Sequence, residues 1–261
     1  MDGVGGPDLE SRCELLRVLH RPGDPLLLPN AWDVATARAV VEVGFPVVAT
    51  TSGGVAATLG HEDHERAPAD EMLDAAARIV RGVEVPVTVD AEAGYGMRPA
   101  QLVSRLRDVG AAGCNLEDTD HTARRLRDPG EQADWLRAVR RAADEIGYPL
   151  VINARIDVFI APYLAGAGPE VMEGLIPDGL RRANAYLEAG ADCVYPLVLW
   201  EAGAVGRFTA AVDGPVNIAR LPQTPSLAEL AALGVARVSW ATFLHSATMS
   251  RFGDDLAALQ G

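Results

Sequence analysis

The sequence contains no lysine, and all 23 of its basic residues are arginine. This absence excludes enzymes that form a Schiff base on a lysine, anchor pyridoxal phosphate through one, or place one in a phosphate-binding loop. The 36 acidic residues outnumber the arginines and give a formal net charge of -13. Because such a surface repels polyanions, the composition argues against partners such as nucleic acid or an anionic membrane.

Cysteine is also scarce. Cys13, Cys114 and Cys193 are widely spaced and form no Cys-x-x-Cys pair. An odd count without such a pair favours a reducing compartment and argues against a structural zinc site. No apolar run reaches the length of a membrane-spanning helix, and the first ten residues lack the basic flank and apolar core of a secretory signal. We therefore expect a cytoplasmic protein.

Eight short apolar runs alternate with helical patterns along the 261 residues. A glycine stands between helix and next strand seven times, which is typical of a helix C-cap. This alternation predicts one (β/α)8 barrel of the TIM type over residues 1–261, with an N-terminal helical extension at 1–22 and a C-terminal helix at 242–261. The alternative is an open, doubly wound sheet, but the glycine-rich dinucleotide fingerprint is absent after the first strand. The predicted strands are 26–30, 47–51, 87–92, 113–118, 150–157, 193–198, 216–220 and 237–241.

The stretch VTVDAEAGYG at 87–96 combines a β-branched strand with two acids and a glycine turn. Side chains in a strand alternate between faces, so Asp90 and Glu92 point to the same side. Paired carboxylates at a buried strand end are unfavourable unless a cation neutralises them. The stretch therefore favours a cation site, and the alternative is a pair of solvated loop acids.

Two further strands place polar side chains at their carboxyl ends by the same alternation. Asn115 and Glu117 share one face, and Asn153 and Arg155 share another. We expect these groups to converge with Asp90 and Glu92 at the mouth of the barrel. Oxygen ligands without histidine or thiolate favour Mg²⁺, and an arginine offers a rigid fork for a carboxylate or phosphonate. The alternative is an internal Arg155–Glu117 salt bridge without a ligand.

Long segments follow the second, fourth and fifth strands, at 52–69, 119–130 and 158–177. Loops at this end of a barrel carry its chemistry. Thr51, Ser52 and Gly53 open the first segment and could form an anion nest, although such residues are also ordinary turn formers. His61 and His64 are expected to be loop residues, and His121 is either solvated or an acid or base near neutral pH.

Five motifs occur in the order found in one superfamily: NAWD at 30–33, TSGGVAA at 51–57, VDAEAGYG at 89–96, NLED at 115–118 and NARID at 153–157. Over residues 26–244 the chain resembles the isocitrate lyase/phosphoenolpyruvate mutase superfamily. The resemblance implies a barrel whose last helix is exchanged between subunits, a homodimer or homotetramer, and Mg²⁺. It also implies 2-oxo or enol carboxylate substrates that react at the P–C or C–C bond next to C3.

The same resemblance implies roles for individual residues. Asp90 would bind Mg²⁺ directly, and Asp63, Glu92 and Glu117 would act through metal-bound water. Thr51, Ser52 and Gly53 would cradle a substrate carboxylate, and Arg155 would bind the substrate with Asn153 beside it. Arg155, Arg124 and His121 are the candidate catalytic residues.

The chain departs from the superfamily pattern at three places. Its acidic motif is DAE instead of DAD. The loop TDHTARRLRDPG has Arg125 about where the lyases carry their acid/base cysteine, and Thr122, Arg124 and Arg125 are the candidates to replace the mutases' loop lysine and asparagine. Leu197 stands where the lyases tend to have glutamate. We therefore expect phosphonomutase-like chemistry, with a C–C lyase or 2-oxo-acid decarboxylase of oxaloacetate or dimethylmalate type as one alternative and a non-catalytic 2-oxo-acid binding protein as another.

Overall fold

The computed structural model describes residues 8–259 and shows a closed parallel barrel. The first barrel strand is made of β1 (Leu26–Leu28) and β2 (Asn30–Ala31), separated at Pro29, which has no amide hydrogen to donate. Pairing of β1 with β11 and a parallel bridge between Val194 and Val216 close the ring. This closure confirms the predicted barrel and excludes the open sheet. The other barrel strands are β3 (Val48–Thr50), β4 (Val87–Asp90), β5 (Gly113–Glu117), β8 (Val151–Ile156), β9 (Cys193–Pro196), β10 (Asn217–Ala219) and β11 (Arg237–Ser239).

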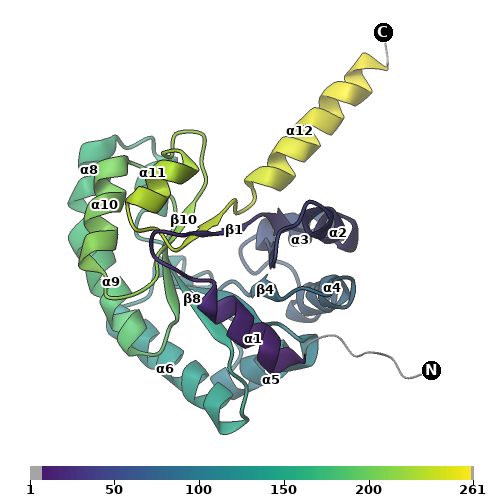
Figure 1. Cartoon of the computed structure of the whole chain (residues 1–261), viewed down its shortest axis with the longest axis horizontal. Coiled ribbons are helices and arrows are strands. Elements are labelled where there is room, and N and C mark those ends of the chain that lie inside the picture. The colour runs from purple at the N-terminus through teal and green to yellow at the C-terminus, as the bar shows by residue number, and fades with distance from the viewer. Residues whose placement is uncertain (1–7, 260–261) are drawn as a thin grey trace.

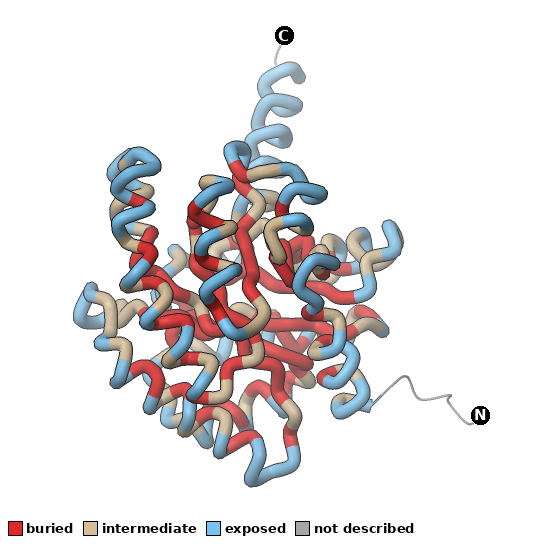
Figure 2. Tube along the Cα trace, turned by 60° about the vertical axis from the view of Figure 1, so that its left-hand side comes forward, coloured by how far each residue is buried: buried red, intermediate tan, exposed pale blue. Residues whose placement is uncertain are grey.

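Helices surround the strands, and the buried residues gather between the two layers (Figures 1 and 2). Gly110 and Gly190 follow helices with φ of 81° and 99°, where a glycine relieves the steric cost of the left-handed region. Gly82 was expected to cap a helix in the same way but has φ of -82°. The surrounding helices are α2 (Val34–Glu42), α4 (Ala69–Arg81), α5 (Pro99–Val109), α6 (Pro129–Glu145), α9 (Ile176–Glu188), α10 (Ala202–Ala211) and α11 (Leu227–Ala232).

Helix α1 (Leu9–Val18) covers the amino-terminal end of the barrel. A Cβ on Gly113, at the start of β5, would lie 2.7 Å from a methyl carbon of the fully buried Leu16. Arg17 donates to the carbonyls of Pro149 and Leu150, just before β8, and pairs with Asp192 at 2.8 Å. These contacts close this end of the barrel, so the site must open at the carboxyl ends of the strands.

Several elements lie in segments that the sequence suggested were loops. Helix α3 (Ser52–Leu59) begins at the motif expected to form a turn. A Cβ on Gly54 would lie 2.7 Å from Thr51 Cγ2 and 3.0 Å from Trp32 Cβ, so this glycine serves close packing and not a turn. After β5 the chain forms an antiparallel hairpin of β6 (Thr119–Asp120) and β7 (Arg125–Leu126). Segment 158–177 holds α7 (Ile160–Leu164) and α8 (Pro169–Gly174).

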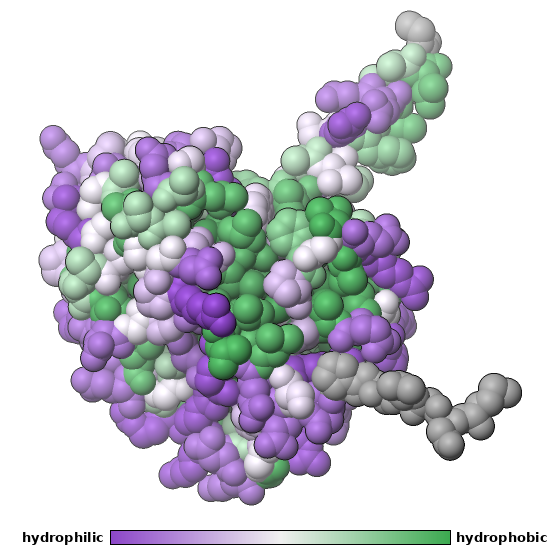
Figure 3. Space-filling model, viewed as in Figure 1, coloured by the Kyte–Doolittle hydropathy of each residue, from purple (hydrophilic) through white to green (hydrophobic). Residues whose placement is uncertain are grey.

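The last helix, α12 (Phe243–Ala258), projects away from the barrel and buries none of its residues (Figures 1 and 2). Its hydrophobic side chains gather along one side (Figure 3), and Phe252 and Leu256 are 54% and 47% exposed. Its start is attached to the barrel, because Thr242 lies 2.9 Å from Thr51, oxygen to oxygen, and His245 packs edge-on against Trp32. Exchange of this helix between subunits stays a prediction. No helix in the described part of the chain combines the length and apolar character needed to cross a lipid bilayer.

Candidate active site

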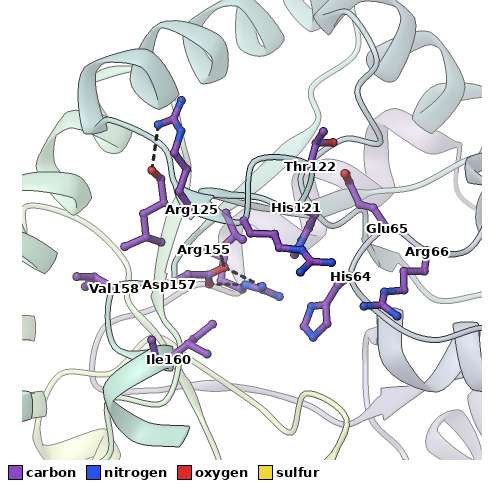
Figure 4. Close-up of a pocket in the computed structure, with 14 residues that line it drawn as sticks. His64, Glu65, Arg66, His121, Thr122, Arg125, Arg155, Asp157, Val158 and Ile160 are labelled. Atoms are coloured by element: carbon purple, nitrogen blue, oxygen red, sulfur yellow. Dashed lines mark hydrogen bonds and ion pairs between the residues drawn. The ribbon is translucent and has the colours of Figure 1, made fainter. Parts of the chain in front are cut away.

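A cavity of about 580 Å³ opens at the carboxyl ends of the strands (Figure 4). Its walls come from three segments that are distant in the sequence: the loop between α3 and α4, the β6–β7 hairpin, and the end of β8 with the start of α7. His64 and Arg155 reach into the same opening from opposite sides in this view. Long-range strand pairing therefore brings the predicted loops together at one end of the barrel.

Arg155 lies at the floor of the cavity and is bound on two sides. Its Nε lies 2.7 Å from Asp157 Oδ1 and its Nη2 lies 2.9 Å from Asp157 Oδ2. Nη2 also pairs with Glu117, which faces Arg155 in the β5–β8 register. Burial alone would lower the pKa of Arg155, but the charges of Asp157 and Glu117 raise it well above its usual value. The Arg155–Glu117 salt bridge, which was the alternative to a ligand site, is therefore present, and the guanidinium is fixed and permanently charged.

Asp90 and Glu92 lie near this pair and form an acidic layer together with Glu117. Asp90 Oδ2 accepts a hydrogen bond of 3.0 Å from the Ser52 amide, while its Oδ1 is buried without a partner. Burial, with the negative charges of Asp90, Asp63 and Glu117, raises the pKa of Glu92 to about 8. Burial also raises the pKa of Glu117 well above its usual value, although Arg155 opposes this shift. The acids thus lie close enough to disfavour one another's ionisation.

This layer fits a cation that makes one direct protein contact. Among residues 8–259, no three histidine, cysteine or acidic side chains are placed to chelate one ion together. The unpartnered Oδ1 of Asp90 is the atom free to bind directly. Mg²⁺ commonly keeps several waters and uses one or two carboxylates, so Asp63, Glu92 and Glu117 fit contacts through water. A bound cation would also relieve the repulsion that raises the pKa of Glu92.

Thr51, Ser52 and Gly53 form the start of α3 and lie next to the acidic layer. A Cβ on Gly53 would lie 2.8 Å from Asp63 Oδ2 and 2.9 Å from Thr242 Oγ1, so any larger residue would displace one of these side chains. The Ser52 amide points at Asp90, as expected for the partly positive end of a helix. The expected anion nest is therefore a helix terminus, and in this structure a carboxylate of the protein itself occupies one of its donors.

Asn153 does not reach the cavity. It is fully buried and donates a hydrogen bond of 2.8 Å to Asn115 Oδ1, which also accepts from Arg237 at 3.2 Å. Asn153 shares a strand face with Arg155 but lies two residues earlier, roughly 7 Å away along the strand. Asn153 therefore lies deeper in the barrel than Arg155, and its role in substrate binding stays a prediction.

The hairpin and the loop before α4 bring two histidines together. His121 contacts Glu117 through Nε2, and its ring centroid lies 5.2 Å from that of His64. Both rings, Arg124 and Arg125 line the cavity, and Arg125 also donates to the Leu126 carbonyl (Figure 4). The sequence prediction missed His64, because only the fold places it beside a residue 57 positions later in the chain.

Asp118 supports the site from behind and was also missed as a functional residue. It is fully buried and accepts hydrogen bonds from the Asp157 amide at 2.9 Å, from Arg182 at 2.8 Å and from the Tyr186 hydroxyl at 2.7 Å. Burial, with the charge of Asp157, raises the pKa of Asp118 to about 6. Through Asp157 this residue fixes the position of Arg155.

A closed parallel barrel with an acidic layer and a fixed arginine at its open end is the architecture of an α/β-barrel enzyme. Residues 15–260 match the model of the phosphoenolpyruvate phosphomutase family, and the chain belongs to this family within the isocitrate lyase/phosphoenolpyruvate mutase superfamily. Members of this superfamily are enzymes, lyases and mutases among them, and this protein is one of them.

Three similar proteins illustrate the range of the superfamily. A crystal structure of a "putative phosphonomutase" from Burkholderia cenocepacia J2315 has a TM-score of 0.89 and 40% identity, and the alignment covers 97% of this chain and 100% of that one. An uncharacterized protein of Mycobacterium tuberculosis (strain CDC 1551 / Oshkosh) is 33% identical, covering 88% of this chain and 82% of its own. The probable 2-methylisocitrate lyase 2 of Corynebacterium glutamicum is 33% identical, covering 78% and 65% respectively.

Proposed function

We propose that the protein is a Mg²⁺-dependent enzyme that acts on a small 2-oxo or enol carboxylate at the bond next to C3, with phosphonomutase-like chemistry. The observation that carries the proposal is the buried, unpartnered Oδ1 of Asp90 beside the fixed Arg155–Glu117 pair. In this proposal Asp90 would be the metal ligand and Arg155 the carboxylate-binding group, at the open end of the barrel. The similarity to the protein named as a phosphonomutase supports this choice.

Each site residue has a proposed role that follows from its position. Asp90 would hold Mg²⁺ directly, with Asp63, Glu92 and Glu117 acting through its waters. When bound, the metal would supply positive charge to stabilise an enolate. Arg155 would orient the substrate carboxylate, with the Thr51 and Ser52 hydroxyls and the Gly53 amide on the other side, because the Ser52 amide already donates to Asp90. His121 and Arg124 line the C3 side of the cavity, where His121 would handle a proton and Arg124 would bind negative charge. The hairpin that carries them would exclude water.

Carbon–carbon cleavage or decarboxylation is the second candidate, supported by the similarity to a probable 2-methylisocitrate lyase. A lyase mechanism with a thiol acid is disfavoured by the positions of the cysteines. Cys13, Cys114 and Cys193 are all buried, and burial raises the pKa of each thiol to about 12. The described hairpin contains no cysteine.

A substrate panel assayed with Mg²⁺ tests the proposal. It contains phosphonopyruvate, phosphoenolpyruvate, oxaloacetate, 2,3-dimethylmalate and 2-methylisocitrate. We expect interconversion of phosphonopyruvate and phosphoenolpyruvate, visible by ³¹P NMR. Turnover of oxaloacetate, 2,3-dimethylmalate or 2-methylisocitrate, without turnover of the two phosphorus compounds, would favour the second candidate. Oxalate binding without turnover of any member would indicate a protein that binds 2-oxo acids only, and would contradict the proposal.

We also propose that residues 1–261 form one domain that assembles as a homodimer or homotetramer in the cytoplasm by exchange of α12. The uncovered apolar side of α12 supports this assembly, because Phe252, Leu256 and Met249 are each about half exposed in the single chain. Packing on the barrel of a second copy would bury them.

A further inference from the structure

One arginine is buried inside the barrel itself. Arg237 begins β11 and is only 1% exposed. Its Nη2 donates a hydrogen bond of 3.2 Å to Asn115 Oδ1 in β5. Three strands separate β11 from β5 in either direction around the closed ring, when β1 and β2 are taken as one strand. The side chain of Arg237 therefore crosses the interior of the barrel from one wall to the opposite wall.

Arg237 has no acidic partner in direct contact. In the part of the chain that the structure describes, no carboxylate lies within ion-pair distance of its guanidinium, and its Nε and Nη1 are buried without a hydrogen-bond partner. The other buried arginine of this kind, Arg182, pairs with Asp118 at 2.8 Å. Because a guanidinium stays protonated and a buried charge is unfavourable unless it is compensated, Arg237 requires a negative charge at longer range.

Asp90 is the carboxylate placed to supply that charge. In the β4–β5 register Asp90 faces Asn115, the residue that Arg237 binds. Facing residues of neighbouring strands lie about 5 Å apart and point to the same side of the sheet, so Asp90 and the guanidinium share the barrel interior beside Asn115. Burial lowers the pKa of Arg237, and the charge of Asp90 opposes this shift. The other groups that oppose it are two thiols and a phenol, which are uncharged near neutral pH because burial raises the pKa of each to about 12.

We propose that Arg237 is the buried counter-charge of Asp90 and that it lowers the affinity of the cation site for a metal ion alone. This inference rests on the proposed function, because it takes Asp90 as the metal ligand. In the absence of metal, the guanidinium offsets the negative charge of Asp90. A dication at Asp90 would lie near a fixed positive charge that cannot be titrated away. A dianionic ligand such as oxalate offsets that charge, so metal and ligand should bind more tightly together than separately.

Calorimetric titration of MgCl₂ into the protein without substrate tests this effect, at about pH 8.5, where protons compete less for the carboxylates. Arg237→Gln removes the charge but keeps a donor for Asn115, and we expect it to bind Mg²⁺ about tenfold more tightly than the wild type, or more. Arg237→Lys is the matched control, because it keeps the charge without the guanidinium fork. Its affinity should stay within about twofold of the wild type.

Two results of this titration would overturn the inference. One is an unchanged or weaker Mg²⁺ affinity in folded Arg237→Gln, and the other is an equal gain in affinity in Arg237→Lys. A wild type that binds no Mg²⁺ either with or without oxalate would instead contradict the proposed function.

A double-mutant cycle in EDTA tests the pairing of the two charges without metal. Urea unfolding compares the wild type, Asp90→Asn, Arg237→Gln and the double variant. We expect Arg237→Gln to change the urea midpoint less favourably in the wild type than in the Asp90→Asn background. Equal changes in both backgrounds would contradict the pairing. If Arg237→Gln alone does not fold, the double variant should still fold, because both charges are removed together, and its failure to fold would show that Arg237 serves packing only.

Discussion

Glu92 shows how the site affects stability at the scale of one residue. Glu92 is 2% exposed, and its carboxyl interacts with the charges of Asp90, Asp63 and Glu117. The folded-state pKa of about 8 lies above the ordinary 4.5. The folded protein therefore binds this proton more tightly than the unfolded chain does. For this group alone, stability is highest below pH 4.5 and falls as the pH rises to about 8.

Glu92→Gln should remove this loss of stability at high pH, because the glutamine side chain carries no charge. Its carbonyl oxygen can still accept the hydrogen bond from the backbone amide of Glu65. In EDTA at pH 8 we expect the variant to be more stable than the wild type, by on the order of 1–3 kcal/mol. At pH 5 the two proteins should differ little. Urea unfolding at both values measures this. Equal stability at pH 8 would show that Glu92 is not held in a repulsive environment.

Individual residues were predictable where strand alternation applies. The two-residue period placed Glu117 and Arg155 at facing positions, where they form the ion pair that was the alternative to a ligand site. It does not account for the position of Glu92 near Asp90, because β4 ends at Asp90 and Glu92 lies in a turn with φ of 48°. The pattern does not show how far along the barrel a side chain lies. Asn153 was therefore expected at the mouth, although it is fully buried. The pattern also gave no information on loops. His64 and Glu65 were missed because their contacts with His121 and Glu92 depend on the folded path of two separate loops.

Elements were predictable where their signal was local. The eight strands are short apolar runs, most of them preceded by a helix and a glycine, and each was found close to its expected position. Helix α3 was missed because Gly53 and Gly54 suggest a turn, whereas both are required by contacts with Asp63, Trp32 and Thr242. The hairpin was missed because its two-residue strands carry no periodic pattern.

The β6–β7 hairpin gives a prediction about mechanism. It supplies His121 and Arg124 to the cavity but no thiol, and all three cysteines of the chain are buried elsewhere. We therefore expect a variant with Cys13, Cys114 and Cys193 replaced by alanine to keep most of its activity on the best substrate of the panel. A circular dichroism spectrum controls for folding. Complete loss of turnover in a folded variant would restore the thiol-dependent lyase mechanism.

Helix α12 gives a prediction about assembly. If its apolar side packs on a second copy, Phe252→Asp and Leu256→Asp together should break the oligomer, because two charges would be buried without partners. Light scattering at micromolar concentration should show a dimer or tetramer for the intact chain and a smaller or aggregated species for the variant. Ser250→Asp, on the same helix, is the control for added charge. A monomeric intact chain would contradict helix exchange.

At the scale of the whole molecule, the barrel could be predicted because its repeat was visible in the sequence. Strand, helix and glycine recur along 261 residues, and the motifs at the strand ends occur in superfamily order. The direction of α12 could not be predicted, because an amphipathic helix looks the same whether it packs on its own barrel or on a partner. The choice among superfamily reactions depends on the loops, which is where the local patterns are weakest.

In the proposed mechanism, Asp90 holds a metal, and the metal in turn holds a 2-oxo acid. Calorimetric titration of oxalate into the wild type and Asp90→Ala, each with Mg²⁺ and with EDTA, tests this claim directly. We predict that oxalate binds the wild type only with Mg²⁺, and that folded Asp90→Ala binds neither Mg²⁺ nor oxalate. Oxalate binding in EDTA, or unchanged Mg²⁺ affinity in Asp90→Ala, would contradict it.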